Sequence, residues 1–225
     1  MGLQFSAEML DDRRGHDTMS ERAFMFVLGL YVVGGLFASS LVAATTYNWH
    51  PNFIVLLIIG LGVPIVGIVV SFKSDNWLVS TLGYALVFIP FGALLGPTVA
   101  LYQLDSVLQV VVATMIVSGI MWVVGTLVPR LPSSWGIYVI GALLVLIAGD
   151  LSRLVMVSFG MQPTVLGIWP WVGIVLFSGL IIYDVNQAMQ RPKTLDNAVD
   201  SAVGIYLDII NLFVRLLEVM GKRKK

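Results

Sequence analysis

The chain has 225 residues, of which 58% are hydrophobic and only 12% are charged. Its mean hydropathy of +0.92 is typical of a protein that crosses a lipid bilayer several times, and it excludes an ordinary soluble domain. The 13 basic and 13 acidic side chains balance, so charge gives no sign of a nucleic-acid partner. Cysteine is absent and only two histidines occur, which excludes thiol catalysis and a histidine-rich metal centre. We therefore expect neither a cofactor nor an enzyme.

The first 22 residues are polar and mixed in charge. They lack the basic start, short apolar core and cleavage site of a secretory signal peptide. We interpret residues 1–22 as a short cytosolic tail, residues 23–221 as one membrane domain, and residues 222–225 as a basic C-terminal tail.

Seven apolar segments follow the tail, and ~20 apolar residues are enough to cross the ~30 Å core of a bilayer. They cover residues 23–47, 53–72, 77–102, 106–128, 135–148, 165–189 and 198–220. Glycine and proline near the middle of the second segment predict a kink there. Asp196 or Asn197 is predicted to cap the last helix. The fold class is an all-α membrane protein with seven transmembrane helices.

The basic residues of the loops and tails give the orientation. With the N-terminus in the cytoplasm, seven of them fall on that side and five on the other, as the positive-inside rule favours. The basic C-terminal tail disagrees with the rule. Either it is translocated, or one segment is re-entrant and both ends are cytoplasmic. We favour seven spans because all seven segments are long and apolar.

Two aspartates lie where lipid disfavours them, Asp184 in the sixth segment and Asp208 in the seventh. A carboxylate inside a bilayer costs at least ~2.5–3.5 kcal/mol, so such groups usually face a partner or water and mark a pathway. Two neighbouring carboxyls share a proton and titrate as a unit. When both ionise, they repel each other and offer hard oxygen ligands that suit calcium. We predict that this pair is a pH sensor and calcium-contacting site; alternatively, each aspartate only packs helices, which is worth ~0.6 kcal/mol.

Five residues of the seventh segment follow a 4-3-4-3 spacing, which places them on one helical face, and all but the first, a glycine, are polar. They are Gly204, Asp208, Asn211, Arg215 and Glu218. Such a stripe belongs inside a bundle, so we expect the seventh helix to be central. Asn211 and Arg215 then support the acidic pair, as does Gln187, which shares a face with Asp184. Arg215 can pair with Glu218, which we favour, or act on Asp208.

The fifth segment becomes polar at its end, where Asp150 and Arg153 lie three residues apart on one face. We expect a local ion pair between them near the far side of the membrane. The alternative is an entrance group that attracts cations.

Several stretches resemble prokaryotic members of the Bax inhibitor-1 family (transmembrane BAX inhibitor motif proteins). They are Leu-Ile-Ile-Tyr-Asp-Val-Asn-Gln at 180–187, Ile-Tyr-Leu-Asp-Ile-Ile-Asn-Leu-Phe at 205–213, and the glycine-proline stretch at 91–97. The resemblance implies a central seventh helix and a calcium leak governed by pH through two aspartates, here Asp184 and Asp208. It also implies an arginine near the cytoplasmic end of the second helix that interacts with the acidic pair. Here Lys73 is the nearest cation, and its ammonium cannot reproduce a guanidinium fork.

We therefore expect a pH-sensitive calcium-permeable leak channel or passive cation transporter in a prokaryotic plasma (inner) membrane. Its partners would be the lipid bilayer, calcium ions and protons. The alternative is a non-transporting membrane protein that modulates a membrane protease or stress response through a membrane-protein partner, as the resemblance also implies. An intramembrane enzyme is a third class, but no substrate site identifies it.

Overall fold

The structure is a computed structural model that describes residues 18–160 and 167–224. Most of the expected N-terminal tail (residues 1–17), the loop at 161–166 and Lys225 lie outside these ranges. The first residues of the expected sixth segment therefore also fall outside them.

Seven helical rods make up the described residues, which confirms the all-α fold class. The rods are α2 (Glu21–Thr45), α3 with α4 (Phe53–Leu57 and Val63–Lys73), α5 (Trp77–Ala100), α6 (Leu104–Leu127), α7 (Gly136–Ser158), α8 (Trp169–Gln190) and α9 (Leu195–Met220). A π-helical segment, Ile58–Gly62, joins α3 to α4, where the kink was predicted. Pro64 follows it directly and cannot donate the backbone hydrogen bond that an α-helix needs there.

The fifth rod continues beyond its apolar run, through Asp150 and Arg153 as expected, to Ser158. The seventh begins at Leu195, and its cap is Thr194, whose hydroxyl accepts a hydrogen bond of 3.2 Å from the Asn197 backbone nitrogen. The prediction that Asp196 or Asn197 caps this helix was therefore wrong, because the Thr194 hydroxyl already takes that bond.

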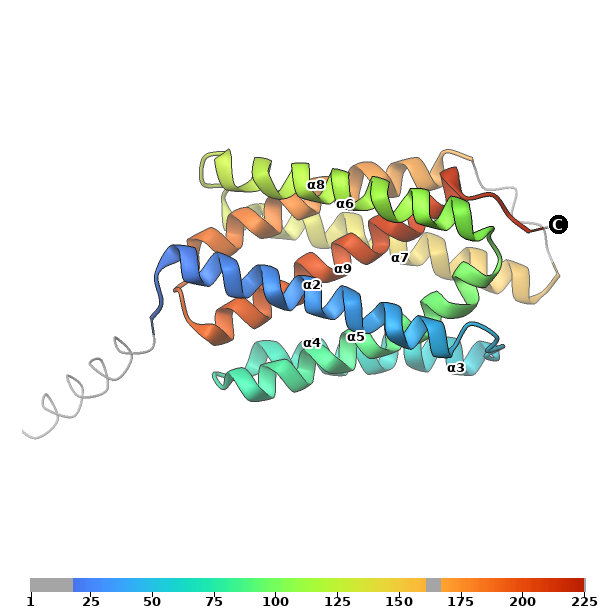
Figure 1. The fold of residues 1–225 in the computed structure, drawn as a ribbon, viewed down its shortest axis with the longest axis horizontal. Coiled ribbons are helices and arrows are strands. Elements are labelled where there is room, and N and C mark those ends of the chain that lie inside the picture. Colours follow the sequence, from blue (N-terminus) through green and yellow to red (C-terminus); the bar gives the residue numbers. More distant parts are fainter. Residues whose placement is uncertain (1–17, 161–166, 225) are drawn as a thin grey trace, which may run out of the picture.

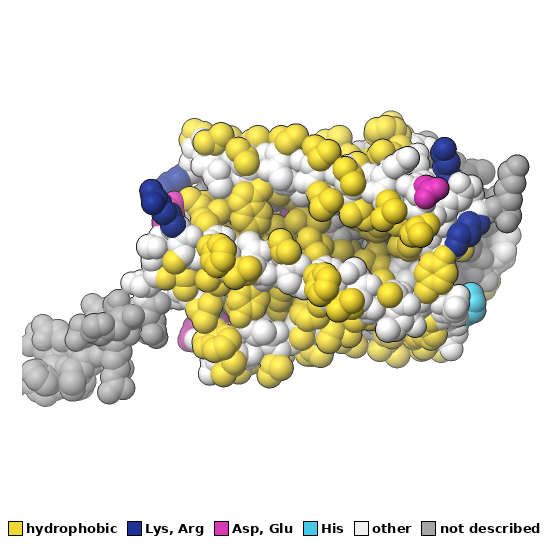
Figure 2. Space-filling view, in the orientation of Figure 1, with side chains coloured by type: hydrophobic (Ala, Val, Ile, Leu, Met, Phe, Trp, Pro, Cys, Tyr) yellow, Lys and Arg dark blue, Asp and Glu magenta, His cyan; other side chains and the backbone are white. Residues whose placement is uncertain are grey.

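The surface is that of a membrane protein. Six of the rods, all except α9, are long and apolar enough to cross a bilayer. Large side chains such as Phe26 (67% exposed) and Ile116 (57% exposed) lie on the outside. Figure 2 shows hydrophobic side chains along the length of the face drawn, with the charged groups at its two ends. α9 differs because it carries five charged residues, of which Asp200, Asp208 and Arg215 are buried in the bundle.

The rods run between two ends of the bundle (Figure 1). At one, which we call the N-side end, the backbone nitrogen of Met19 donates to the Lys193 carbonyl at 2.8 Å, so the start of α2 meets the α8–α9 turn. At the other, the C-side end, Gln103 and Lys222 are joined by a backbone hydrogen bond of 2.8 Å. The basic C-terminal residues therefore lie at the end of the bundle away from Met19.

α9 is the central helix. It packs against α2, α4, α5, α6 and α8, and Figure 1 shows it crossing the middle of the bundle. Tyr206 is fully buried on it, and its ring meets the edge of Tyr84 on α5 at a centroid distance of 5.5 Å. α7 is peripheral by comparison and packs chiefly on α8. The enclosed position explains how α9 can carry charges within an apolar bundle.

Candidate functional site

The two predicted aspartates come together where α8 and α9 cross. The Asp184 carboxylate lies directly against Gly204 of α9, where a β-carbon would collide with its Oδ2 atom. Asp208 follows Gly204 by four residues and so lies one helical turn away on the same face. The charges of Asp184 and Asp208 are close enough to interact. Gly204 thus has a specific role, because its missing side chain makes room for a carboxylate from the neighbouring helix.

Asp208 is the least satisfied polar group of this site. Its side chain is 5% exposed. Among the described residues, no hydrogen-bond partner reaches its Oδ2 atom. An unpaired buried carboxylate is costly, so it normally binds a proton, a cation or water. Such a pair can hold a proton or contact a cation; its role as a pH sensor and calcium-contacting site stays a prediction.

Two more aspartates occupy the same face of α9 toward the N-side end; sequence reasoning considered Asp196 only as a helix cap and passed over Asp200. Asp200 is 6% exposed and accepts a hydrogen bond of 2.5 Å from the Ser71 hydroxyl of α4. Asp196 accepts one of 2.6 Å from the Ser80 hydroxyl of α5. A signal was present in the sequence, because positions 196, 200, 204 and 208 are spaced four apart.

The cation near these carboxylates is Arg191, in the α8–α9 turn. Its charge acts on both Asp184 and Asp200, and its guanidinium lies 5.7 Å from the centre of the Phe72 ring. Lys73, the expected cation, ends α4 and is exposed; it forms no ion pair in the part of the chain that the structure describes. Sequence reasoning missed Arg191 because it lies in a turn, 118 positions after Lys73, and nothing in the sequence places that turn next to α4.

Lys193 fixes the turn that carries Arg191. Its ammonium donates hydrogen bonds to the carbonyls of Ala188 (3.2 Å), Met189 (2.6 Å) and Arg191 (3.0 Å). A cation at this position complements the negative end of the α8 dipole. Desolvation lowers the pKa of Lys193, while the Glu21 carboxylate acts in the opposite direction. The end of α8 next to Asp184 is therefore held in place.

The predicted supporting amides lie outside the acidic pair. The Gln187 side chain donates to the Leu131 carbonyl at 2.9 Å, in the segment between α6 and α7. Asn211 donates to the Leu207 carbonyl of its own helix at 2.8 Å. Asn186, which sequence reasoning passed over, accepts a hydrogen bond of 2.8 Å from the Leu131 backbone nitrogen. These amides fix the backbone around the end of α6 and within α9.

The charged residues toward the C-side end form a separate network between α7 and α9. Arg215 is 5% exposed and forms an ion pair with Asp150 of α7. It also lies 3.3 Å from a Glu218 oxygen, as favoured from the sequence. Glu218 lies 3.6 Å from Arg153, and the indole nitrogen of Trp169 donates to Asp150 at 3.2 Å. The expected local pair between Asp150 and Arg153 was wrong, because each residue pairs with α9 instead.

This network is about two helical turns from the acidic pair, since Arg215 follows Asp208 by seven residues. Arg215 therefore neutralises Asp150 and Glu218 rather than Asp208. Gly173 of α8 lies against the Arg215 side chain, so the guanidinium is enclosed by three helices. The predicted entrance residues, Asp150 and Arg153, thus belong to a partly exposed cluster of paired charges in this structure.

Residues 18–160 and 167–224 contain no cluster of side chains suited to tight metal binding. No three histidine, cysteine, aspartate or glutamate side chains group there as metal ligands would. Calcium prefers six to eight oxygen ligands, and the two carboxylates of Asp184 and Asp208 have four oxygens between them. Water or backbone oxygens would have to complete the shell. The two carboxylates alone therefore supply only part of a calcium coordination shell.

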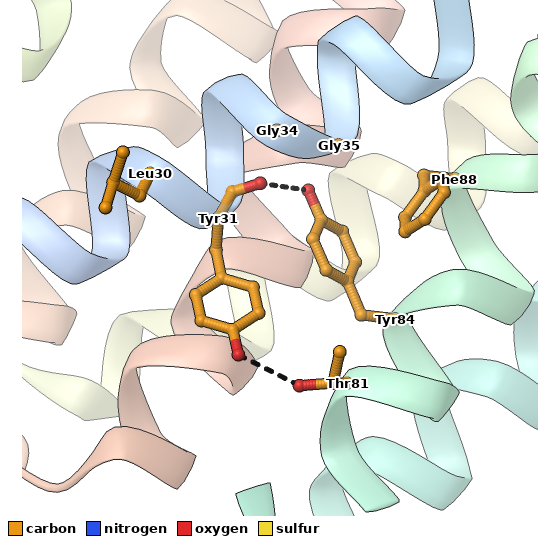
Figure 3. Close-up of a pocket in the computed structure, with 7 residues that line it drawn as sticks. All are labelled: Leu30, Tyr31, Gly34, Gly35, Thr81, Tyr84 and Phe88. Atoms are coloured by element: carbon orange, nitrogen blue, oxygen red, sulfur yellow. Dashed lines mark hydrogen bonds between the residues drawn. The ribbon is translucent and has the colours of Figure 1, made fainter. Parts of the chain in front are cut away.

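A groove between α2 and α5 is a different kind of feature (Figure 3). It has a volume of about 310 Å³ and is lined by Leu30, Tyr31, Gly34, Gly35, Thr81, Tyr84 and Phe88. Figure 3 shows the Tyr84 hydroxyl donating to the Tyr31 carbonyl (3.1 Å) and the Tyr31 hydroxyl bonded to Thr81 (3.1 Å). Its polar groups are satisfied, so the groove carries no obvious chemistry.

Comparison with known proteins places this arrangement in a family. The family model Bax1-I, described as inhibitor of apoptosis-promoting Bax1, matches residues 22–225. An uncharacterized membrane protein of Streptococcus pyogenes serotype M1 is 28% identical over 192 residues, which cover 78% of this chain and 82% of that protein. The inner membrane protein YbhL of Escherichia coli is 25% identical over 184 residues, 75% of this chain and 76% of that protein.

A plant relative is more similar over a shorter stretch. Protein LIFEGUARD 3 of Arabidopsis thaliana is 36% identical over 85 residues, which cover 38% of this chain and 33% of that protein. The family model spans all seven helical rods, including the acidic pair and the paired charges of α9. The chain therefore belongs to the Bax inhibitor-1 family of multi-pass membrane proteins.

Proposed function

We propose that this protein is a pH-sensitive, calcium-permeable leak channel or passive cation transporter. Asp184 and Asp208 serve as its pH sensor and ion-contacting pair. The observation that carries the proposal is the Asp208 Oδ2 atom, which is buried and without a partner among the described residues. A structural carboxylate would be expected to have both oxygens satisfied.

Protons and calcium compete for this pair. A proton shared between Asp184 and Asp208 removes one charge and joins α8 to α9 by a hydrogen bond. When the proton leaves, the carboxylates repel each other and become hard ligands for calcium. Calcium binding therefore releases a proton and strengthens as the pH rises. This competition is the physical basis of the proposed pH sensitivity.

The proposal includes the topology. α9 crosses the bilayer as the seventh span, its charges shielded by the five helices that pack around it. The N-terminus lies in the cytoplasm, so that the acidic pair faces the cytoplasmic half of the membrane. The name of YbhL, an inner membrane protein, supports a prokaryotic inner membrane as the location.

Calcium flux into liposomes that contain the purified protein tests the proposal. It would be measured from pH 5 to 8 for the parent and for the Asp184→Asn/Asp208→Asn variant. Asparagine keeps the size of each side chain and removes its charge. We expect a pH-dependent flux in the parent and a flat profile in the variant. An equally strong pH response in the variant would exclude the pair as the sensor.

A parent that gives no flux above empty liposomes at any pH would favour a non-transporting modulator. Co-purification with a stable membrane-protein partner would then be the expected behaviour, and the aspartates would serve to pack α8 against α9.

A further inference from the structure

Four carboxylates form a ladder along the N-terminal half of α9. Asp196, Asp200, position 204 and Asp208 recur every four residues, a spacing that brings side chains to about 5–6 Å of one another on one helical face. Position 204 is a glycine, and the Asp184 carboxylate from α8 fills the space beside it. Carboxylates therefore follow one another without interruption from the N-side end to Asp208.

A neutral side chain could fill the structural role of Asp200 as well as its carboxylate does. Among the described residues, its one hydrogen bond comes from the Ser71 hydroxyl, and an asparagine oxygen could accept the same bond. Asp200 forms no ion pair within the described ranges. A buried carboxylate without a cation partner is costly. Asp208 lies at the inner end of the ladder, and its Oδ2 atom has no hydrogen-bond partner among the described residues. The ladder therefore ends at an oxygen that is free to bind a ligand.

Other charged groups around Asp200 set the local field. Asp196 on α9 and Asp75 in the α4–α5 turn add negative charge, while Arg191 in the α8–α9 turn adds positive charge. Arg191 also acts on Asp184. Three carboxylates against one guanidinium leave the N-side end of the ladder with an excess of negative charge. In low-dielectric surroundings, one dominant sign of charge raises the local concentration of counter-ions by roughly ten- to a thousandfold.

We propose that Asp200, with Asp196 at the outer edge, is the access site through which a hard divalent cation of the calcium class reaches Asp184 and Asp208 from the N-side end. This inference rests on the proposed function, since it assigns the route to the same acidic pair. Asp200 attracts the cation by its charge, and the Ser71 hydrogen bond orients its carboxylate.

Three substitutions separate charge from packing. Asp200→Asn removes the charge and keeps the acceptor for Ser71. Ser71→Ala removes the hydrogen bond and keeps the charge. Asp200→Glu keeps the charge on a longer side chain. The purified proteins would be compared for calcium flux into liposomes at low and at high ionic strength, after a check that each elutes as a single species in detergent.

We expect Asp200→Asn to lower the flux roughly tenfold at low ionic strength, and the difference to shrink at high ionic strength because salt screens the field. Ser71→Ala and Asp200→Glu should stay within about threefold of the parent, because both retain the attracting charge. A flux for Asp200→Asn equal to that of the parent would overturn the proposal. So would an equal loss in Ser71→Ala, which would show that the hydrogen bond is what matters.

Calcium binding to the detergent-solubilised protein distinguishes this inference from the proposed function. A parent without flux would overturn the leak proposal. Calcium binding would then still test the role of Asp200. A calcium affinity unchanged in Asp200→Asn would overturn the access site. A weakened affinity in that variant alone would support it.

Discussion

The two halves of α9 differ in whether their charged residues have ionic partners. Toward the N-side end, Asp196, Asp200 and Asp208 share one face with Asp184, and the described residues give none of them an ion pair. Toward the C-side end, Arg215 pairs with Asp150 and Glu218, and Glu218 contacts Arg153. One half has unneutralised carboxylates and the other a balanced set of two acids and two bases.

The difference separates a region suited to cations from a region that holds the helices together. Carboxylates without basic partners can bind protons or calcium. Charges that neutralise each other in a buried pair leave little affinity for a passing ion, and breaking such a pair is costly. Because α7 has few other contacts with the bundle, its link to Arg215 is a major part of what holds it against α9. A conducting path along α9 would have to open that link or pass beside it.

The largest effect is expected when the paired half is broken. Arg215→Met keeps most of the side-chain length and removes the ionic partner of Asp150 together with one of the two partners of Glu218. We predict a loss of about 3 kcal/mol in the free energy of unfolding, the low end of the range for buried pairs because Asp150 is partly exposed. Thermal or chemical unfolding in detergent measures it.

Arg153→Met is the matched control for that variant. Within the described ranges Arg153 forms one ion pair, of 3.6 Å with Glu218, and its side chain is 30% exposed, so its loss should cost at most about 1 kcal/mol. Equal losses for the two variants would contradict the special role of the Arg215 pair.

Gly204→Ala disturbs the ladder in the unpaired half. The new β-carbon would collide with the Asp184 carboxylate, which can rotate away because it is the end of a side chain. We predict a cost of about 1 kcal/mol in stability, together with a weakened pH response of calcium flux. Gly179→Ala on α8, where no atom lies within 4 Å of the added carbon, should leave the pH response intact. An unchanged response in Gly204→Ala would contradict the placement of Asp184.

Arg191→Gln removes a cation whose charge acts on both Asp184 and Asp200. Without that positive charge the carboxylates should bind calcium about fivefold more tightly, equivalent to about 1 kcal/mol. Calcium titration of the purified protein measures the change. Lys73→Gln, which alters an exposed cation with no ion pair in the described residues, should change the affinity less than twofold. A larger change in calcium affinity for Lys73→Gln than for Arg191→Gln would show that Lys73 is the relevant cation.

The smallest effect is expected from Trp169→Phe. It removes the hydrogen bond of 3.2 Å from the indole nitrogen to Asp150 and leaves the Arg215 ion pair in place. We predict a loss of about 0.5–1 kcal/mol in stability and an unaltered pH profile of flux. A changed profile would show that the C-side network takes part in proton sensing.

The sequence predicted what depends on local pattern. Long apolar runs indicated the helices, and the 4-3-4-3 spacing identified the face of α9 that holds Asp208 and Arg215. Pairings across the fold could not be predicted in the same way. Asp150 and Arg215 are 65 residues apart, so the nearer Arg153 was the only partner that spacing could suggest. The space beside Gly204 depends on the crossing of α8 and α9, which no single helix encodes.

The most direct test of the account is proton release on calcium addition. The purified protein in weakly buffered detergent at near-neutral pH would be titrated with calcium while the proton concentration is followed. The account predicts that the parent releases up to about one proton per molecule, because the pair shares one proton, and that Asp184→Asn/Asp208→Asn releases none. Calcium binding to the parent without proton release, or equal release from the double variant, would contradict it.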